Sequence, residues 1–296
     1  MKYQVLLFYK YVHVADPQAL MVSYRTLCEK YHLKGRTIIA EEGINSTLEG
    51  TIEETENFLK EFLTDERFSD MQIKRSEGFG ETFPKLSVKV REEIVGTHFP
   101  KEVDPTKLTA PYLTPEELRT WYEEEKDFVV VDMRNSYEFA SGHFKKSIDP
   151  GMTASRELPQ LIDKIKKETA GKTVLTVCTG GVRCEKMSAL LLHEGMKDVY
   201  QLDGGMHSYM EKYPGKDFLG TLFTFDNRLV MDFGGEREVI GKCKKCDSKT
   251  EQYQNCANGA CNLLFLLCDG CTEEGEPIFC SDTCKTKAVH IVQRVR

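Results

Sequence analysis

The chain of 296 residues is 40% hydrophobic and 29% charged, which is enough apolar material for two or three domains with cores of their own. Its formal net charge of −7 excludes a general electrostatic attraction to nucleic acid, so any RNA contact must come from local basic patches. The apolar run near Met1 is too short for a signal peptide, and no stretch approaches the length of a membrane span. We therefore expect a cytoplasmic protein that does not enter a membrane.

Residues 1–97 form the first predicted domain, of mixed α+β class. Its pattern changes in the order β-α-β-β-α-β, which is the split βαβ arrangement of ferredoxin-like and acylphosphatase-like folds. Alternating or β-branched runs predict the strands and amphipathic runs predict the helices. The expected strands are 2–12, 36–40, 44–48, 72–75 and 85–90, and the expected helices are 17–31 and 51–63.

A polar turn stands out in this domain between Glu41 and Thr47. Asn45 and Ser46 lie beside Gly43 and could present hydrogen-bond donors to a phosphate or a base. The alternative is ordinary turn chemistry, because glycine and asparagine are the usual residues where φ must be positive. Composition favours the turn chemistry.

Residues 98–111 contain three prolines and no clear period, which predicts a linker. Residues 112–213 follow as a second domain, and Thr114 and Glu117 form a capping box at the start of its first helix. Strands then alternate with helices, so we expect an α/β domain with a parallel sheet covered on both faces. The expected strands are 128–131, 174–177 and 199–202, and the expected helices include 158–165 and one that begins near residue 183.

The turn that begins at Cys178 is the candidate reactive site. It follows a short apolar strand, and open α/β sheets bind ligands at the carboxyl ends of their strands. The turn leads into a helix, so backbone N–H groups and the positive end of the helix dipole converge on one point. Such surroundings lower a thiol pKa from ~8.5 into the range ~3.5–7.5 and favour the thiolate. We therefore predict Cys178 as a nucleophile in a substrate- or anion-binding loop made of Thr179, Gly180, Gly181, Val182 and Arg183.

Two alternatives concern the cysteines of this segment. Cys178 could be a buried structural cysteine, although that role requires neither the two glycines nor Arg183. Cys184 is a possible second thiol that would resolve an oxidised Cys178. Its place on the helix, beyond the loop, favours a packing role instead.

Residues 214–296 are predicted to hold a hairpin, with strands at 221–225 and 229–231, followed by a cysteine-rich region. Four close cysteine pairs supply the thiolates for two tetrahedral zinc sites, whose pairing the spacing does not decide. Disulfides conflict with the expected compartment, and a four-iron cluster usually has three cysteines in one tight run. A site filled by four thiolates has no open position for a substrate, so we expect both zinc ions to be structural. The predicted ligands are Cys243, Cys246, Cys256, Cys261, Cys268, Cys271, Cys280 and Cys284.

The second domain resembles the rhodanese family in the order and spacing of four motifs. They are Asp132-x-Arg134, Glu138-x4-His143, the Cys178–Arg183 loop and residues 202–205. The resemblance implies that Asp132, Arg134 and His143 are mainly structural. Related protein phosphatases have one more residue between the cysteine and the arginine, so the shorter loop favours a small reacting group.

The three units together resemble a bacterial family of rhodanese-like, oxygen-dependent tRNA uridine hydroxylases. The resemblance implies conversion of the wobble uridine of tRNA to 5-hydroxyuridine, with Cys178 as the essential residue. It also implies tRNA as the partner, molecular oxygen as co-substrate and no obvious organic cofactor, and it leaves protein partners unknown. The residues themselves establish only an activated cysteine in a loop suited to anions.

Other functions remain open at this point. Cys178 could add to C6 of uracil, or it could carry a persulfide as in a plain rhodanese-type sulfurtransferase. A non-catalytic RNA-binding adaptor is a further alternative, for which a replaced loop cysteine would be typical. Basic residues near the loop and the cysteine pairs could follow an anticodon stem. These residues are Lys145, Lys146, Arg183, Lys186, Lys242, Lys244, Lys245, Lys285, Lys287, Arg294 and Arg296.

Overall fold

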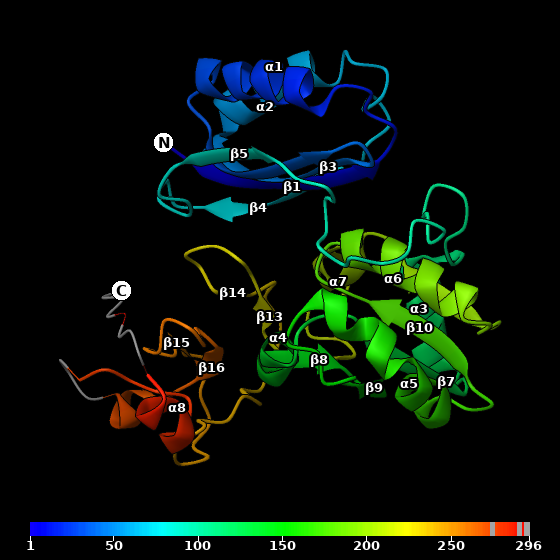
Figure 1. The fold of residues 1–296 in the computed structure, drawn as a ribbon, viewed down its shortest axis with the longest axis vertical. Helices are drawn as coiled ribbons and strands as arrows, with labels where there is room; N and C mark the ends of the chain where they lie inside the picture. The colour runs from blue at the N-terminus through cyan, green and yellow to red at the C-terminus, as the bar shows by residue number, and fades with distance from the viewer. Residues whose placement is uncertain (273–275, 289–291, 293–296) are drawn as a thin grey trace.

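The computed structural model describes residues 1–272, 276–288 and 292. It contains an N-terminal α+β domain, a central α/β domain and a C-terminal cysteine-rich region (Figure 1). These units confirm the predicted fold classes, whereas the predicted boundaries after residues 97, 111 and 213 stay predictions. In the part of the chain that is described, no helix is long and apolar enough to cross a membrane.

The N-terminal domain is one five-stranded sheet with two helices on one face (Figure 1). The strand order is β4-β1-β3-β2-β5, and every pairing is antiparallel except that of β2 with β5. The predicted β-α-β-β-α-β order is confirmed, with β5 added at one edge. The elements are β1 (Tyr3–Tyr11), α1 (Pro17–Lys30), β2 (Lys34–Ala40), β3 (Gly43–Thr51), α2 (Ile52–Phe62), β4 (Lys74–Gly78) and β5 (Leu86–Val90).

Strand β1 has apolar side chains on both of its faces. Leu6 and Phe8 are fully buried in the core under the two helices. Because side chains alternate along a strand, Leu7, Tyr9 and Tyr11 lie on the opposite face of the sheet. That face contacts the central domain, where the Tyr11 hydroxyl donates to the carbonyl of Val182 at 3.1 Å. The sheet is therefore covered on both faces, and the face opposite the two helices is an interface with the central domain.

The polar turn between β2 and β3 is part of the domain's own hydrogen bonding. The buried Ser46 hydroxyl lies 2.7 Å from the Tyr24 hydroxyl and 2.8 Å from that of Thr37. The Asn45 amide donates to the carbonyl of Ile94 at 3.2 Å. These contacts support turn and packing chemistry for the segment, rather than presentation of donors to a ligand.

The central domain is a parallel five-stranded sheet of order β6-β11-β10-β7-β9. Side chains of α5 and α6 pack on one face, and those of α3 and α7 pack on the other. The first part of the helix predicted at 158–165 is a 3₁₀ helix (η1) containing Pro159, which has no N–H to donate within a helix. The elements are β6 (Tyr112–Leu113), α3 (Pro115–Glu123), β7 (Phe128–Asp132), α4 (Ser136–Ser141), β8 (Gly142–Phe144), β9 (Ser147–Ile148), η1 (Ser155–Leu161), α5 (Ile162–Glu168), β10 (Thr173–Val177), α6 (Val182–His193), β11 (Val199–Leu202) and α7 (Gly205–Lys212).

The C-terminal region begins by pairing with the central domain, because β12 is antiparallel to β8. The predicted hairpin is present but shorter than expected, with two residues paired on each strand. Asp226 shapes its turn by accepting from the backbone N–H of Arg228 at 3.0 Å. The elements are β12 (Phe218–Gly220), β13 (Leu222–Phe223), β14 (Val230–Met231), β15 (Tyr253–Asn255), β16 (Leu264–Leu266), η2 (Asp269–Cys271) and α8 (Asp282–Thr286).

The loop after β4 is held by one buried carboxylate, that of Glu49 on β3. Its side chain is 2% exposed and accepts from the backbone N–H groups of Phe79 at 3.0 Å, Gly80 at 2.8 Å and Thr82 at 2.9 Å. It also accepts from the Thr82 hydroxyl. Four donors therefore depend on a single buried side chain, which fixes the loop at this edge of the sheet, where the N–H of Asn227 donates to the carbonyl of Thr82 at 3.1 Å.

We predict that Glu49→Ala loosens this loop without unfolding the chain. An unsatisfied buried donor costs about 1–3 kcal/mol, so the amides of residues 79–82 should exchange with heavy water roughly tenfold to a hundredfold faster. Hydrogen–deuterium exchange measured by mass spectrometry checks this prediction. The control is Glu77→Ala, because the Glu77 side chain is exposed. Equal exchange in the two variants would contradict the role of Glu49.

Candidate active site and metal centres

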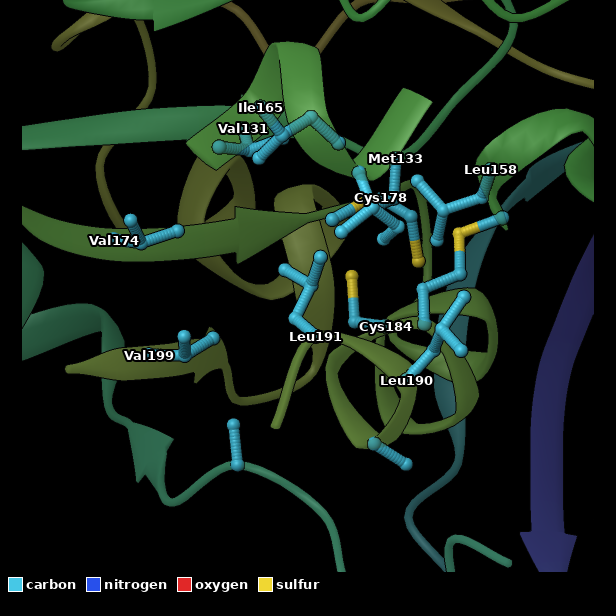
Figure 2. Close-up of a cluster of buried hydrophobic side chains, with 14 of the residues drawn as sticks. Val131, Met133, Leu158, Ile165, Val174, Cys178, Cys184, Leu190, Leu191 and Val199 are labelled. Carbon is cyan, nitrogen blue, oxygen red and sulfur yellow. The ribbon is translucent and has the colours of Figure 1, made fainter. Parts of the chain in front are cut away.

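Cys178 lies at the end of β10, in the turn that leads into α6, as predicted from the sequence. Its side chain is 0% exposed, and the backbone N–H of Gly181 donates to Sγ at 3.2 Å. Gly181 has a φ of 104°, which a residue with a Cβ rarely adopts. Cys178 and Cys184 lie in the same cluster of buried apolar side chains (Figure 2).

The turn before α7 supports the cysteine loop from behind. The N–H of Met206 donates to the carbonyl of Cys178 at 2.9 Å, and that of His207 donates to the carbonyl of Thr179 at 3.0 Å. A Cβ on Gly205 would lie 2.6 Å from the Cys178 carbonyl oxygen, so only glycine permits this approach. The motif at residues 202–205 thus holds the loop in place.

The guanidinium group of Arg183 forms a buried, two-bond ion pair with Glu138. Nη1 lies 2.7 Å from Oε1 of Glu138, and Nη2 lies 2.9 Å from Oε2. Nη2 also lies 3.2 Å from Oγ1 of Thr179, so the arginine ties the loop to α4. The Glu138 side chain is fully buried and also accepts from the N–H of Asn135 at 2.9 Å. Arg183 therefore supplies a fixed positive charge beside Cys178, while both of its Nη atoms are already bonded to Glu138.

These surroundings favour the thiolate form of Cys178. Burial alone would disfavour the thiolate, but the Cys184 thiol, the Arg183 charge and the N–H groups of Cys184 and Gly181 outweigh it and lower the Cys178 pKa to about 6. Burial and the neighbouring Cys178 raise the pKa of Cys184 well above its usual value. Cys184 is thus a neutral thiol that packs in the core and donates to its neighbour.

The other motif residues support the scaffold. Arg134 pairs with Asp132 through Nε–Oδ1 at 2.9 Å and Nη2–Oδ2 at 2.7 Å, and both side chains are buried. The His143 ring stacks on Phe139 with centroids 3.9 Å apart, and its Nδ1 lies 3.0 Å from the Phe139 carbonyl oxygen. No residue of this group points a free functional group at Cys178, which agrees with the structural role that the rhodanese resemblance implied.

The N-terminal sheet forms a roof over the cysteine loop, made of Leu7, Tyr9 and Tyr11. A Cβ on Gly180 would lie 2.9 Å from Cδ2 of Leu7, and one on Gly181 would lie 2.7 Å from the Tyr9 hydroxyl. This contact was not predicted from the sequence, although apolar residues on both faces of β1 were a signal for it. The site therefore lies between two domains.

Lys186 is not available for RNA, contrary to the sequence-based prediction. Its side chain is 4% exposed, and Nζ lies 2.8 Å from Oε2 of Glu42 and 2.8 Å from Oε1 of Glu93. Both carboxylates belong to the N-terminal part of the chain, so this buried lysine links the two domains beside the roof.

Other basic residues of the prediction remain on the surface. The exposed ones are Lys145, Lys146, Lys242, Lys244, Lys245, Lys285 and Lys287. Arg294 and Arg296 lie outside the described residues.

The eight paired cysteines form two groups that could each hold a metal ion. Within each group the four sulfur atoms all lie within 4.8 Å of one another. Sγ–Sγ distances are 3.6 Å for Cys246 and Cys268 and 3.5 Å for Cys256 and Cys284. Four sulfurs bound at ~2.3 Å around a tetrahedral ion are about 3.8 Å apart, so the dimensions fit. The groups are Cys243, Cys246, Cys268, Cys271 and Cys256, Cys261, Cys280, Cys284.

The two groups interleave along the chain, because the first pair joins the third and the second joins the fourth. The structure thus resolves the pairing that spacing left open.

We predict that Cys178 titrates near pH 6 rather than near the ordinary thiol value of about 8.5. The difference in ultraviolet thiolate absorbance between the wild type and Cys178→Ser should therefore rise with a midpoint of about 6. Arg183→Met should move this midpoint upward, since the thiolate loses a nearby positive charge. Burial raises the pKa of Cys28 to about 12, so Cys28→Ser should leave the curve unchanged. A midpoint at or above the ordinary value would refute the activated thiolate.

Comparison with known families matches three successive parts of the chain. Residues 3–94 match the UPF0176 acylphosphatase like domain, residues 114–212 match the rhodanese-like domain, and residues 219–285 match the rhodanase C-terminal family. The matched segments follow the order of the three units in the fold.

Two relatives match nearly the whole chain. A tRNA uridine(34) hydroxylase from Staphylococcus aureus strain bovine RF122 / ET3-1 and another from strain MRSA252 are each 42% identical over 290 residues, which is 96% of this chain and 90% of theirs. Among solved structures, a rhodanese-related protein from Thermoplasma volcanium is 22% identical over 35% of this chain and 93% of its own, with a TM-score of 0.29. The extent of identity to the first two relatives shows that the chain belongs to the tRNA uridine(34) hydroxylase family.

Proposed function

We propose that this chain hydroxylates the wobble uridine, at position 34 of tRNA, to 5-hydroxyuridine. The observation that carries the proposal is a buried cysteine thiolate, held by Arg183 and by backbone N–H groups, in a chain that matches hydroxylases of this uridine over 96% of its length. The reaction uses molecular oxygen as co-substrate. With tRNA as substrate, the expected compartment is the cytoplasm.

Nucleophilic addition is the chemistry that this cysteine can supply. The Cys178 thiolate adds to C6 of the uracil ring, and the electron pair of the C5–C6 double bond moves toward C5 and the C4 carbonyl oxygen. C5 then becomes electron-rich and reacts with an oxidant derived from molecular oxygen. Because one oxygen atom of O₂ goes to C5 and the other leaves as water, the step also takes up two protons and two electrons from a reductant. Loss of the C5 proton and departure of the thiolate restore the aromatic base.

The thiolate needs no general base of its own. A thiol with a pKa of about 6 is mostly ionised at neutral pH. Among the described residues, Gly181 and Cys184 supply the hydrogen bonds to Sγ, and no histidine or carboxylate is hydrogen-bonded to it. Cys178 therefore differs from a serine nucleophile, which depends on an adjacent base.

RNA contacts are proposed at the junction of the three units, near the loop. Phe225 is 49% exposed, and the Arg183 guanidinium carbon lies 5.7 Å from the centre of its ring. Phe79, which is 54% exposed, lines a cleft of about 440 Å³ together with Arg75, which also binds Glu56, and Arg228, which also binds Asp226. Exposed aromatic rings stack single-stranded bases, and arginines bind phosphates. The exposed lysines listed above would extend this surface.

The metal in both cysteine groups is proposed to be zinc, with a structural role. Four thiolates at tetrahedral spacing suit zinc and have no open position for a substrate. Because metal binding stabilises small folded units, the two ions would order the segment from residue 243 to residue 284.

A rhodanese-type sulfurtransferase is the second candidate function. A Cys178 persulfide could form in the same loop, since its N–H groups stabilise any anion on the sulfur. A sulfurtransferase would require neither the roof over the loop nor the exposed aromatic rings. A non-catalytic RNA-binding adaptor is disfavoured by the lowered pKa of the cysteine, which binding alone does not require.

We predict that Cys178→Ser abolishes 5-hydroxyuridine formation, because a serine hydroxyl without a base is a poor nucleophile. Arg183→Lys should retain a small part of the activity, since a lysine cannot make both bonds to Glu138. Cys184→Ser should be milder than either, because serine still donates to Cys178. The measurement is the nucleoside content of tRNA from an aerobic strain that lacks the endogenous gene and carries each variant.

Two outcomes would decide between the candidates. Wild-type levels of 5-hydroxyuridine with Cys178→Ser would exclude the nucleophile. Transfer of sulfur from thiosulfate to a thiol acceptor by the purified protein, with no change in the tRNA, would favour the sulfurtransferase.

We predict that the purified protein holds two zinc ions, one in each cysteine group. Cys243→Ser and Cys256→Ser should each lower the zinc content by one ion, and the double variant should lower it by two. Cys28→Ser is the matched control, because Cys28 lies in the N-terminal core away from both groups. Elemental analysis of the freshly prepared protein makes the measurement. Iron in place of zinc would disprove the assignment.

A further inference from the structure

Lys74, at the start of β4, is a buried lysine that has no ion-pair or hydrogen-bond partner in the described part of the chain. Lys74 is 5% exposed, and it lies opposite Leu7 of the roof in the pairing of β4 with β1. Across residues 1–272, 276–288 and 292, no carboxylate lies within ion-pair distance of Nζ and no acceptor forms a hydrogen bond with it. Nearly all buried ammonium groups are paired, because an isolated charge is costly in a medium of low dielectric constant.

The Lys74 side chain reaches across the interface to the cysteine loop. Its Cε lies 3.4 Å from where a Cβ on Gly204 would be, and the neighbouring Gly205 packs on the Cys178 carbonyl. Nζ lies 5.5 Å from the centre of the Tyr9 ring, whose hydroxyl approaches Gly181. Lys74 and the roof residue Tyr9 thus border the loop from the N-terminal domain.

Burial and the charges around Lys74 act in opposite directions on its pKa, which lies below the usual lysine value. Burial lowers its pKa, whereas the negative charges of Cys178, Asp203, Glu185 and Glu211 oppose that effect. Glu185 lies against the hydroxyls of Tyr9 and Tyr112, and burial raises its own pKa. Negative groups therefore surround the lysine, and its hydrogen-bonding capacity is unused among the described residues.

We propose that Lys74 is a substrate-contacting residue of the same site, and this inference rests on the proposed function. Its ammonium donates a hydrogen bond to the C4 carbonyl oxygen of the uracil on which Cys178 acts. When Sγ bonds to C6, the π electrons of the C5–C6 bond move through C5 and C4 onto that oxygen, which becomes an enolate. A donor placed where charge develops stabilises the transition state rather than the free base.

This role gives the N-terminal domain a part in the chemistry. The thiolate comes from the central domain and the cation from the N-terminal domain, so the site is complete only when the two are together. Cys178 is 0% exposed beneath Leu7 and Tyr9, so the roof must separate from the loop before a base can enter. Closure on the base then brings Lys74 against it.

Exchange of the uracil C5 hydrogen tests the proposal without oxygen. In heavy water, the enolate takes up a deuteron at C5, after which loss of the original proton and of the thiolate regenerates a labelled uridine. Wild-type protein is incubated anaerobically with tRNA carrying an unmodified uridine at position 34. Mass spectrometry of the anticodon fragment then gives the rate of deuterium uptake.

We expect Lys74→Met to slow this exchange by roughly 10²-fold, as removal of one oxyanion donor does. Lys74→Arg, which keeps a positive donor, should restore part of the rate. Lys34→Met is the matched control, because Lys34 is a partly buried lysine of the same sheet that donates to the Gly80 carbonyl. Circular dichroism and zinc content verify that each variant is folded.

Equal ionisation of the thiolate separates contact with the base from an effect on the thiolate. The thiolate midpoint of each protein is measured from its ultraviolet absorbance, and the exchange is compared about one pH unit above that midpoint, where roughly nine tenths of the thiol is ionised. A deficit of Lys74→Met that persists there supports the contact, whereas a deficit that vanishes, or exchange at the wild-type rate, overturns it. Exchange without aerobic 5-hydroxyuridine would refute the proposed hydroxylation alone. Absence of exchange in the wild type would refute the enolate and the role of Lys74.

Discussion

The buried ion pair between Arg183 and Glu138 is the interaction on which the reactive site depends. It joins the first turn of α6 to α4 through two bonds of 2.7 and 2.9 Å, and Glu138 also accepts from the start of α4. Removing one partner of such a pair leaves a buried charge and typically costs about 3–5 kcal/mol. Because the same guanidinium lowers the pKa of Cys178, the interaction that shapes the loop also keeps the cysteine reactive.

A second consequence follows from the position of the loop between two domains. Lys186 binds two carboxylates of the N-terminal part, Tyr11 donates to Val182, and Leu7 and Tyr9 lie on the glycines of the loop. An isolated rhodanese-like domain would leave these surfaces open to water. Here the glycines permit a close approach by a second domain as well as a tight turn. The enclosure removes water from the thiolate and strengthens every electrostatic interaction around it.

Local features of the site could be predicted from the sequence, and long-range ones could not. Cys178, its glycines and Arg183 lie within six consecutive residues, so strand, turn and helix patterns were enough to place them. Lys186 looked like a surface charge because its partners Glu42 and Glu93 are far away along the chain. Lys74 was missed because its place beside Gly204 depends on contacts between residues far apart along the chain. The interleaved cysteine pairing also depends on how β15 and β16 bring distant pairs together, which spacing does not reveal.

The cysteine-rich region is connected to the reactive loop by a short series of contacts. The Tyr253 hydroxyl on β15 donates to the carbonyl of Tyr137 at 2.7 Å, and Phe223 packs between their two rings. Tyr137 precedes Glu138, whose carboxylate fixes Arg183 and therefore the Cys178 loop. A metal-ordered segment thus packs against α4 on one side, while Arg183 forms an ion pair with Glu138 of this helix on the other side. A structural metal site can therefore influence the thiolate without contacting the substrate, because the helix between them carries the one carboxylate that the loop requires.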